Sequence, residues 1–298
     1  MFHTTVLLNE GVEALNIMPD GVYVDATYGG GGHARAVLDR LGDKGVLLAF
    51  DQDAEVAEML SEDGRLKFYP ANFRFLKRFL LAEGIHGVDG ILADLGVSGR
   101  HFDAPERGFS FRYDAELDMR MNRSQPKSAR EVLNTYSESE LRRVFKDYGE
   151  TAYASRLARA VVKGREAGEL KTTGRFTDLV EQVVPRHKVK GELPKVFQAI
   201  RIEVNDELGA LKQLLSDAAG LIKPGGRLVV ISYHSLEDRL VKYFLRSGNF
   251  DDRQEKDVFG NTLRPFDPLG KPITPTPEEI KTNPRARSAK LRIGIKRP

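Results

Sequence analysis

Four consecutive glycines, at positions 29–32, stand between a short β-branched segment at 22–25 and a helical pattern that begins at His33. The helix is predicted over residues 33–41, because apolar residues recur through it at the spacing of one helix face. A tight turn from strand to helix needs one or two glycines, whereas four leave the backbone open to close approach by a ligand. The run therefore predicts a strand–loop–helix unit whose loop binds a ligand.

Three further strands are predicted in the N-terminal part of the chain, at 46–50, 66–69 and 90–94. Their alternation with helical patterns predicts a parallel sheet with helices on both faces. Ligands of such sheets bind at the carboxyl ends of the strands, which is where the glycine run lies.

The strand pattern stops between residues 105 and 210, where amphipathic helical stripes dominate. Ser137 and Glu140 predict a capping box at the start of one of these helices. The stripes are assigned to a helical core, because apolar residues at helical spacing form core far more often than cofactor contacts.

Strands return after the Lys-Pro-Gly-Gly turn at 223–226, with a strand at 227–232, a helix at 235–246 and a last strand at 289–296. We therefore predict an α/β fold, a doubly wound sheet interrupted by a domain insertion. Two domains are predicted: residues 1–104 and 211–298 form the core, and residues 105–210 form an inserted all-helical domain.

Asp51 ends the second predicted strand, about twenty residues after the glycine run. Sheets of this kind place a carboxylate there to accept hydrogen bonds from the two ribose hydroxyls of a nucleoside. Asp53 is the competing acid, but it lies beyond the strand end and is interpreted as a helix cap. The glycine run and Asp51 together predict a ligand that contains adenosine.

The glycine run does not match the full pattern of either of two phosphate-binding motifs. A P-loop is excluded, because no Gly-Lys-Ser/Thr follows the glycines. The dinucleotide pattern G-x-G-x-x-G fits Gly29 and Gly31 only if Ala34 replaces the last glycine. The residues by themselves leave NAD(P) and S-adenosylmethionine open.

The chain contains no cysteine, which excludes disulfides, thiolate metal sites and a cysteine nucleophile. His3, His86 and His187 show no metal-ligand spacing, so no metal is predicted. No apolar run approaches the ~20 residues of a membrane span, and the N-terminus lacks the pattern of a signal peptide. We expect a cytoplasmic protein with no membrane partner.

Charge is unevenly distributed along the chain. Residues 1–104 carry 9 Lys/Arg and 16 Asp/Glu, whereas residues 211–298 carry 17 and 10. The last segment, 281–298, holds seven basic residues and no acid. A tail of this kind indicates a polyanionic partner, and a merely solubilising basic terminus is the alternative that charge alone leaves open.

Long strings in the chain resemble one family in order and over nearly the whole length: HTTVLLNE, YVDATYGGGGH, DLGVS, ERGFSF, LDMRM, FQAIRIEVNDEL, PGGRL, SYHSLEDR and NPRARS. The family is the S-adenosylmethionine-dependent ribosomal RNA small-subunit methyltransferase H family, also called MraW. The resemblance implies a class I methyltransferase sheet with a helical insertion. It further implies methyl transfer to the N4 amine of a cytidine in the decoding region of 16S rRNA.

The resemblance also assigns site residues. It implies that S-adenosylmethionine is contacted by Gly31, Gly32, His33, Asp51, Phe73, Asp94 and His101. Many family members have Ser-Ser-Pro-Gln-Leu-Asp where this chain has Ser-Gly-Arg-His-Phe-Asp at 98–103. An imidazole at position 101 replaces an amide there, so the contact made by His101 is expected to differ.

The amine of cytosine is a weak nucleophile, because its lone pair is conjugated with the ring. A site can assist by orienting the amine and accepting its hydrogens. We hypothesise that Asp94 accepts one amine hydrogen and that Ser232, Tyr233 and His234 complete the pocket. For His234 the alternative is a structural role in a helix cap, since Glu237 and Asp238 follow it.

The target base must be unstacked to react, and RNA-binding sites hold such bases on aromatic and guanidinium planes. Phe109, Phe111 and Tyr113 lie among arginines just after the fourth predicted strand and suit this role. Packing of the inserted domain is the alternative for each of them. The 16S rRNA of the small ribosomal subunit is the predicted partner, and a homodimer is compatible with the sequence.

Two other classes of function are retained at this point. A nicotinamide oxidoreductase has a similar sheet and would bind its cofactor at Asp51. A non-catalytic RNA-binding assembly factor would keep the fold without transferring a methyl group.

Overall fold

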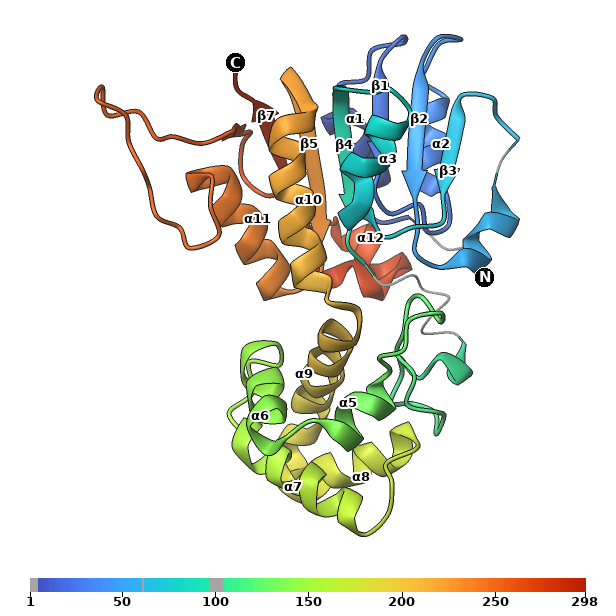
Figure 1. Cartoon of the computed structure of the whole chain (residues 1–298), viewed down its shortest axis with the longest axis vertical. Coiled ribbons are helices and arrows are strands. Elements are labelled where there is room, and N and C mark those ends of the chain that lie inside the picture. The colour runs from blue at the N-terminus through green and yellow to red at the C-terminus, as the bar shows by residue number, and fades with distance from the viewer. Residues whose placement is uncertain (1–4, 61, 97–103) are drawn as a thin grey trace. The chain divides into compact units, whose positions relative to one another are not determined.

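The computed structural model describes residues 5–60, 62–96 and 104–298 (Figure 1). Contacts divide the chain into two compact units, one of Met1–Gly96 with Leu208–Pro298 and the other of Val97–Glu207. The boundaries predicted from the sequence, before 105 and after 210, lie slightly further along the chain. Helix α10 (Glu207–Leu221) begins directly at the second boundary, so the helical pattern runs on without a break that sequence could reveal.

The first unit contains one seven-stranded sheet in the order β3-β2-β1-β4-β5-β7-β6. Strands β1 to β5 pair in parallel, and β7 pairs antiparallel with both β5 and β6. The strands are β1 Val22–Asp25, β2 Val46–Phe50, β3 Leu66–Tyr69, β4 Val88–Asp94, β5 Ile222–Ser232, β6 Phe266–Pro268 and β7 Lys290–Lys296. The predicted doubly wound sheet is confirmed.

Strand β5 is longer than predicted. The segment 223–226 was expected to be a turn, because it reads Lys-Pro-Gly-Gly. The strand instead begins at Ile222, which pairs with Val88, and the register shifts before Arg227 pairs with Gly90. Gly225 keeps a positive φ of 80°, so the turn-forming residues are accommodated as an irregularity within the strand.

Helices cover both faces of the sheet (Figure 1). Apolar side chains of α1 (Leu8–Ala14) and α2 (Gly32–Leu38) pack on one face. Those of α3 (Leu76–Ala82), α10 and α11 (Ser235–Ser247) pack on the other. Because both faces are buried, the central strands are almost entirely apolar, and polar groups are confined to the strand ends.

The second unit is helical and has a separate core. Its helices are α5 Ala129–Thr135, α6 Glu138–Asp147, α7 Ala154–Glu166, α8 Thr173–Val183 and α9 Arg186–Asn205. Ser137 and Glu140 form the predicted capping box at the start of α6. The predicted apolar stripes form a single buried cluster, so their assignment to core is confirmed. In the described parts of both units, no helix is long and apolar enough to cross a membrane.

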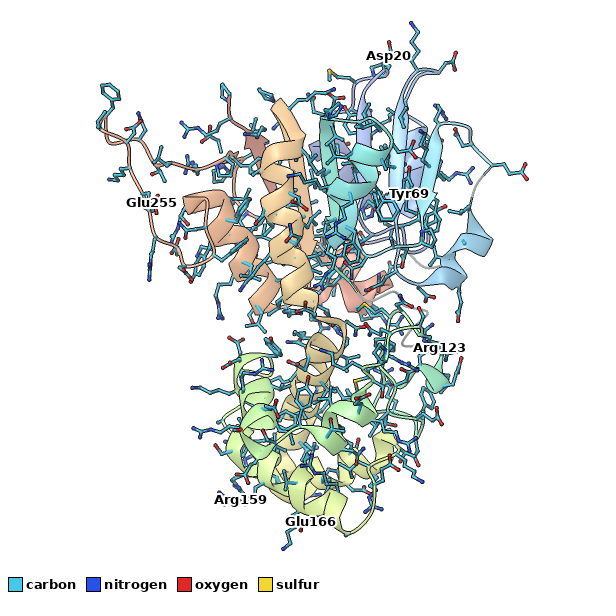
Figure 2. The ribbon with its side chains drawn as sticks, viewed as in Figure 1. Asp20, Tyr69, Arg123, Arg159, Glu166 and Glu255 are labelled. Carbon is cyan, nitrogen blue, oxygen red and sulfur yellow. The ribbon has the colours of Figure 1, made fainter. Side chains whose placement is uncertain are left out.

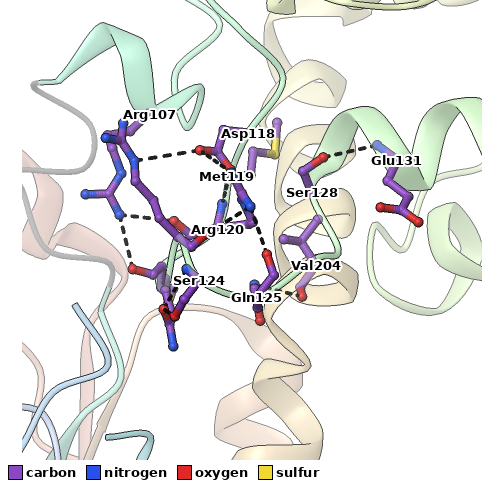
Figure 3. A network of polar contacts seen from close by, with 12 residues as sticks. Arg107, Asp118, Met119, Arg120, Ser124, Gln125, Ser128, Glu131 and Val204 are labelled. Carbon is purple, nitrogen blue, oxygen red and sulfur yellow. Dashed lines mark hydrogen bonds and ion pairs between the residues drawn. The ribbon is translucent and has the colours of Figure 1, made fainter. Parts of the chain in front are cut away.

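A polar network holds the irregular segment before α5 against α9 (Figure 3). The buried side chain of Asn205 donates from Nδ2 to the carbonyl of Met119, at 2.8 Å, and accepts the N–H of Met121 at Oδ1, also at 2.8 Å. Arg107 donates to the carbonyls of Arg120 and Met121. Met119 has a φ of 57°, a backbone conformation that a residue other than glycine adopts only when its surroundings enforce it.

Replacing Asn205 by alanine is expected to destabilise the helical unit by about 3 kcal/mol, because it removes the donor to the buried carbonyl of Met119 and the acceptor of the partly buried N–H of Met121. The free energy of unfolding in urea, followed by circular dichroism, measures the change. The matched control is Asn122→Ala, whose exposed side chain bonds, within the part of the chain that the structure describes, only to Ser124 in its own turn. Equal destabilisation by the two substitutions would contradict the role given to Asn205.

Candidate active site

Three carboxylates lie where neighbouring parallel strands end. Asp25 is the last residue of β1, Asp94 is the last residue of β4, and Asp51 directly follows β2. The carboxyl ends of parallel strands meet at one edge of a sheet, so sequence positions far apart converge there. The glycine run between β1 and α2 reaches the same edge, as predicted.

The glycine loop is shaped by backbone conformation and by packing against the protein itself. Gly29 and Gly31 have φ values of 53° and 75°, which glycine adopts without strain. A Cβ atom at Gly31 would lie 2.8 Å from the Tyr28 hydroxyl, and one at Gly32 would overlap the hydroxyl of Thr5. The predicted contact residues Gly31 and Gly32 therefore have to be glycine for the loop to keep this path.

Asp51 fastens the glycine loop to the end of β2. Its Oδ2 accepts the N–H of Gly29 at 2.8 Å, and its Oδ1 accepts the N–H of Asp53 at 2.9 Å. A carboxylate has about four acceptor positions, so the same group can also accept hydroxyl donors. Asp53 accepts the N–H of Glu55 and caps the 3₁₀ helix Ala54–Met59, which confirms the interpretation of Asp53 as a cap.

Phe73 lies at the next strand end along the sheet. It opens the 3₁₀ helix Phe73–Phe75 after β3 and is partly buried against the sheet core. The preceding residue, Asn72, donates from its side chain to Gln52 at 2.9 Å. This bond holds the loop that carries Phe73 beside the loop that carries Asp51, so an aromatic ring and a carboxylate are presented together.

Asp94 forms hydrogen bonds through both its backbone N–H and its carboxylate. Its N–H donates to the Thr27 hydroxyl at 2.7 Å, which ties β4 to the glycine loop. Its carboxylate accepts the hydroxyl of Tyr233, and burial together with the charge of Asp94 raises the pKa of that hydroxyl above its usual range. Tyr233 therefore remains a neutral hydrogen-bond donor.

His33 is buried in the first turn of α2, with its Nδ1 atom 3.9 Å from Oδ2 of Asp94. Burial lowers the pKa of His33, against the opposing effects of Asp94 and of the backbone at Leu7 and Val6. Its ring is consequently neutral at neutral pH. The structure places His33 beside Asp94, and its contact with the donor stays a prediction.

Of the three residues predicted at the end of β5, Tyr233 is the one that bonds to Asp94. The Ser232 hydroxyl donates to the carbonyl of Lys290 on β7, at 3.4 Å. His234 is the N-cap of α11, where its Nδ1 accepts the N–H of Glu237 at 3.4 Å. Catalytic roles for Ser232 and His234 stay predictions. The structural role considered for His234, that of a helix cap, is present in the structure.

Sequence reasoning did not select Asp25, although it ends the first strand. Its side chain is 1% exposed, and its Oδ1 accepts the N–H of Thr27 at 3.0 Å. Its Oδ2 is buried with no hydrogen-bond partner among the described residues. Burial raises the pKa of Asp25 to about 7, the Thr27 N–H opposes this, and the charges of Asp94 and Asp51 add to it. The position of Asp25 at the end of a predicted strand was the sequence feature that could have identified it.

The raised pKa makes a prediction about stability. The folded protein favours the neutral form of Asp25. The stability that Asp25 contributes is therefore fully present below its ordinary pKa of 3.8 and is lost as pH rises through about 7. Asn mimics the neutral acid without titrating. Asp25→Asn is therefore expected to gain stability over the parent chain between about pH 5 and pH 8, with a rise in melting temperature of roughly 5 °C.

Thermal unfolding at several pH values tests this expectation. The control is Asp63→Asn, because Arg65 lowers the pKa of Asp63 to about 2, so Asp63 does not titrate in this range. A melting-temperature difference for Asp25→Asn that is constant with pH would show that Asp25 is ionised throughout.

The aromatic residues predicted to stack on RNA have different surroundings within the helical unit. Phe109 is 4% exposed and belongs to the core, so packing is its role in the structure. Phe111 and Tyr113 are 37% and 54% exposed, and Phe111 packs edge to face on Phe197 at 5.5 Å. His101, predicted to contact the donor, lies outside the described residues.

Comparison with known proteins gives a match over almost the whole chain. The model of the MraW methylase family matches residues 1–297. A Flavobacterium johnsoniae protein named ribosomal RNA small subunit methyltransferase H is 52% identical over 295 residues, which are 99% of this chain and 98% of the relative. A Phocaeicola vulgatus protein of the same name is 50% identical over 100% of this chain and 98% of its own length.

Solved structures give a weaker likeness. An rRNA methylase from Streptococcus thermophilus has 11% identity and a TM-score of 0.43, with 100% of both chains covered. TrmN from Thermus thermophilus has 13% identity and a TM-score of 0.40, covering 97% of this chain and 48% of TrmN. Neither score identifies a ligand or a reaction for this chain.

Proposed function

The chain belongs to the MraW methylase family, and on that premise we propose that it transfers a methyl group from S-adenosylmethionine to the N4 amine of a cytidine in 16S rRNA. The proposed position is in the decoding region of the small subunit, and the proposed location is the cytoplasm. The observation that carries the proposal is the convergence of Asp51, Asp94 and the glycine loop at one sheet edge of a chain that the family model matches over residues 1–297.

The residues at this edge suit a cationic donor that contains adenosine. Burial raises the pKa of Asp25, the charges of Asp94 and Asp51 add to this effect, and a cation at the same edge would offset that repulsion. We propose that Asp51 accepts the ribose hydroxyls, that Phe73 contacts the adenine, and that the backbone at 31–32 passes close to the donor. When bound, S-adenosylmethionine supplies an electrophilic methyl group on a positively charged sulfur.

Asp94 is the proposed catalytic residue. Its carboxylate can accept a hydrogen of the cytidine amine, which directs the amine and increases electron density on its nitrogen. The bond from Tyr233 and the Asp94 N–H bond to Thr27 fix that carboxylate in place. Attack by an exocyclic amine needs no protein nucleophile, which agrees with the absence of cysteine.

Ser232 and His234 are proposed as positioning residues for Tyr233, which stands between them. The Ser232 hydroxyl fixes the end of β5 to β7, and His234 fixes the start of α11. Both act on the backbone that carries Tyr233, and Tyr233 bonds to Asp94. His33 is proposed to contact the donor as a neutral ring beside Asp94.

The RNA is proposed to bind through exposed aromatic and basic residues. Phe111 and Tyr113 remain available for stacking on an unpaired base, because they are exposed. The basic segment 281–298 is proposed to contact phosphates, so RNA affinity should fall as salt concentration rises.

The decisive experiment supplies methyl-labelled S-adenosylmethionine with two substrates, small subunits that lack this modification and free 16S rRNA. Label at N4 of one decoding-region cytidine, located by nuclease digestion and mass spectrometry, is the expected result. Label on a ring carbon or a ribose would overturn the assignment of the amine. No label in either RNA would favour a non-catalytic assembly factor, and competition by NAD for the Asp51 site would favour an oxidoreductase.

A further inference from the structure

The first unit has a pocket that the proposed reaction does not use. It is a small open cavity of about 180 Å³. Its lining comes from α11 and from the β6–β7 edge of the sheet, and consists of Lys242, Leu245, Arg246, Pro268, Leu269, Gly270, Lys271, Pro272, Arg292 and Ile293. We propose that this pocket binds an unpaired nucleotide of the RNA substrate, away from the methyl-acceptor base.

The rim of the pocket is fixed by backbone hydrogen bonds. After β6, the chain is hydrogen-bonded to β7 at two points. The N–H of Leu269 donates to the carbonyl of Ile293 at 2.9 Å, and the backbones of Ile273 and Leu291 donate to each other. Between these points Gly270 has a φ of 68°, which turns the chain outward. The pocket is therefore built into the sheet edge, and its rim does not depend on a ligand for its shape.

The charge of the lining is positive. Four of the ten lining residues are Lys or Arg, and none is acidic. Asp238 engages Arg292 with two hydrogen bonds, and Arg246 is paired with Asp252. Lys242 and Lys271 are exposed and form no ion pair with the described residues, so they carry the uncompensated charge. An anionic ligand is the one that this rim attracts.

Leu245 and Ile293 are the buried members of the lining and give the pocket an apolar floor, whereas Pro268 and Pro272 are exposed. An apolar floor with cationic groups beside it matches a nucleotide, whose base packs on the floor while its phosphates reach the lysines. The volume is below the range of pockets that enclose a whole drug-sized ligand, so we assign one base rather than several. The choice of RNA rests on the proposed function.

A second copy of the chain is the competing occupant, because a long segment after α11 presents two apolar side chains to solvent. Figure 2 labels Glu255 on this segment. At its tip Val258 and Phe259 are 93% and 86% exposed, and the Asp257 carboxylate accepts the N–H groups of Phe259 and Asn261 to hold the turn. Residues 251–257 carry four acids and two bases. Asp252 is paired with Arg246, and Asp257 is bonded within its own turn, so the remaining acids are balanced by Arg253 and Lys256 and do not explain the two lysines.

The test measures binding of a short fluorescein-labelled single-stranded RNA by fluorescence anisotropy over a range of salt. The double variant Lys242→Glu, Lys271→Glu is expected to bind at least tenfold more weakly, and the slope of log affinity against log salt should fall by about two. The control, Lys44→Glu with Lys77→Glu, makes the same charge change at exposed positions near β2 and in α3. Unchanged affinity for S-adenosylmethionine shows that each variant is folded.

Crosslinking locates the contact directly. RNA containing 4-thiouridine is expected to crosslink to peptides that include the pocket residues, and crosslinks found only elsewhere would overturn the inference. If the parent chain binds no RNA, the proposed function fails. If it binds RNA and both double variants bind it equally, only the pocket assignment fails.

The oligomeric state separates the two occupants. If sedimentation shows a dimer that Phe259→Asp and the Lys242, Lys271 double variant both dissociate, the pocket belongs to a second copy and the inference is wrong. A sedimentation coefficient that neither change alters supports the RNA assignment.

Discussion

Asp94→Ala is expected to lower the rate of methyl transfer by about two to three orders of magnitude while changing the affinity for S-adenosylmethionine less than about tenfold. The carboxylate is the proposed acceptor of an amine hydrogen, and alanine removes it. The Asp94 N–H bond to Thr27 belongs to the backbone, so the glycine loop keeps its anchor in the variant. Single-turnover kinetics at saturating donor and RNA measure the rate, and calorimetry measures the affinity.

Two variants sharpen the interpretation of this result. Asp94→Asn keeps the shape but loses the charge, and is expected to lose most of the rate as well. Tyr233→Phe removes only the hydroxyl that donates to Asp94, and about a tenfold loss is expected. A fall in donor affinity as large as the fall in rate would make Asp94 a donor-binding residue alone.

Asp51→Ala is expected to weaken binding of S-adenosylmethionine by about 10²- to 10⁴-fold. Two hydrogen bonds from ribose hydroxyls to a carboxylate are worth roughly 1.5–3 kcal/mol each, and each 1.4 kcal/mol is a factor of ten. The substitution also removes the acceptor of the Gly29 N–H, which loosens the glycine loop. Isothermal titration calorimetry measures the change.

The demethylated product supplies a comparison for the same variant. S-adenosylhomocysteine carries the same ribose, so its affinity should fall by a similar factor. Asp53→Ala is the control, because Asp53 caps the 3₁₀ helix after β2 and is expected to change affinity less than about threefold. Parent-like binding of both ligands by Asp51→Ala would remove Asp51 from the donor site.

Much of the fold follows from local sequence. The strands at 22–25, 46–50 and 66–69 were predicted at their observed bounds, because short β-branched runs between turn signals have few alternatives. The capping box at Ser137 was equally local, since all its atoms lie within one helical turn. The β5 strand was shortened in the prediction because Gly225 looks like a turn, and pairing with β4 overrides that preference.

Asp51 and the glycine run could be selected from sequence because spacing along one β-α-β unit fixes their positions relative to each other. The partner of Asp94 could not be selected in this way. Ser232, Tyr233 and His234 are consecutive, and a strand end followed by a helix start sends their side chains in different directions. Asp25 escaped notice because its raised pKa depends on burial and on two acids from other strands.

The sequence alone determined the alternating strands and helices, the glycine loop and the family, since each depends on residues near one another in the chain or on long matching strings. Tertiary structure decided that Tyr233 bonds to Asp94, that Asp25 favours its neutral form, and that Lys242 and Lys271 share one pocket. Hydrogen bonds, burial and electrostatic repulsion depend on distances between atoms of different elements, and only the folded chain sets those distances.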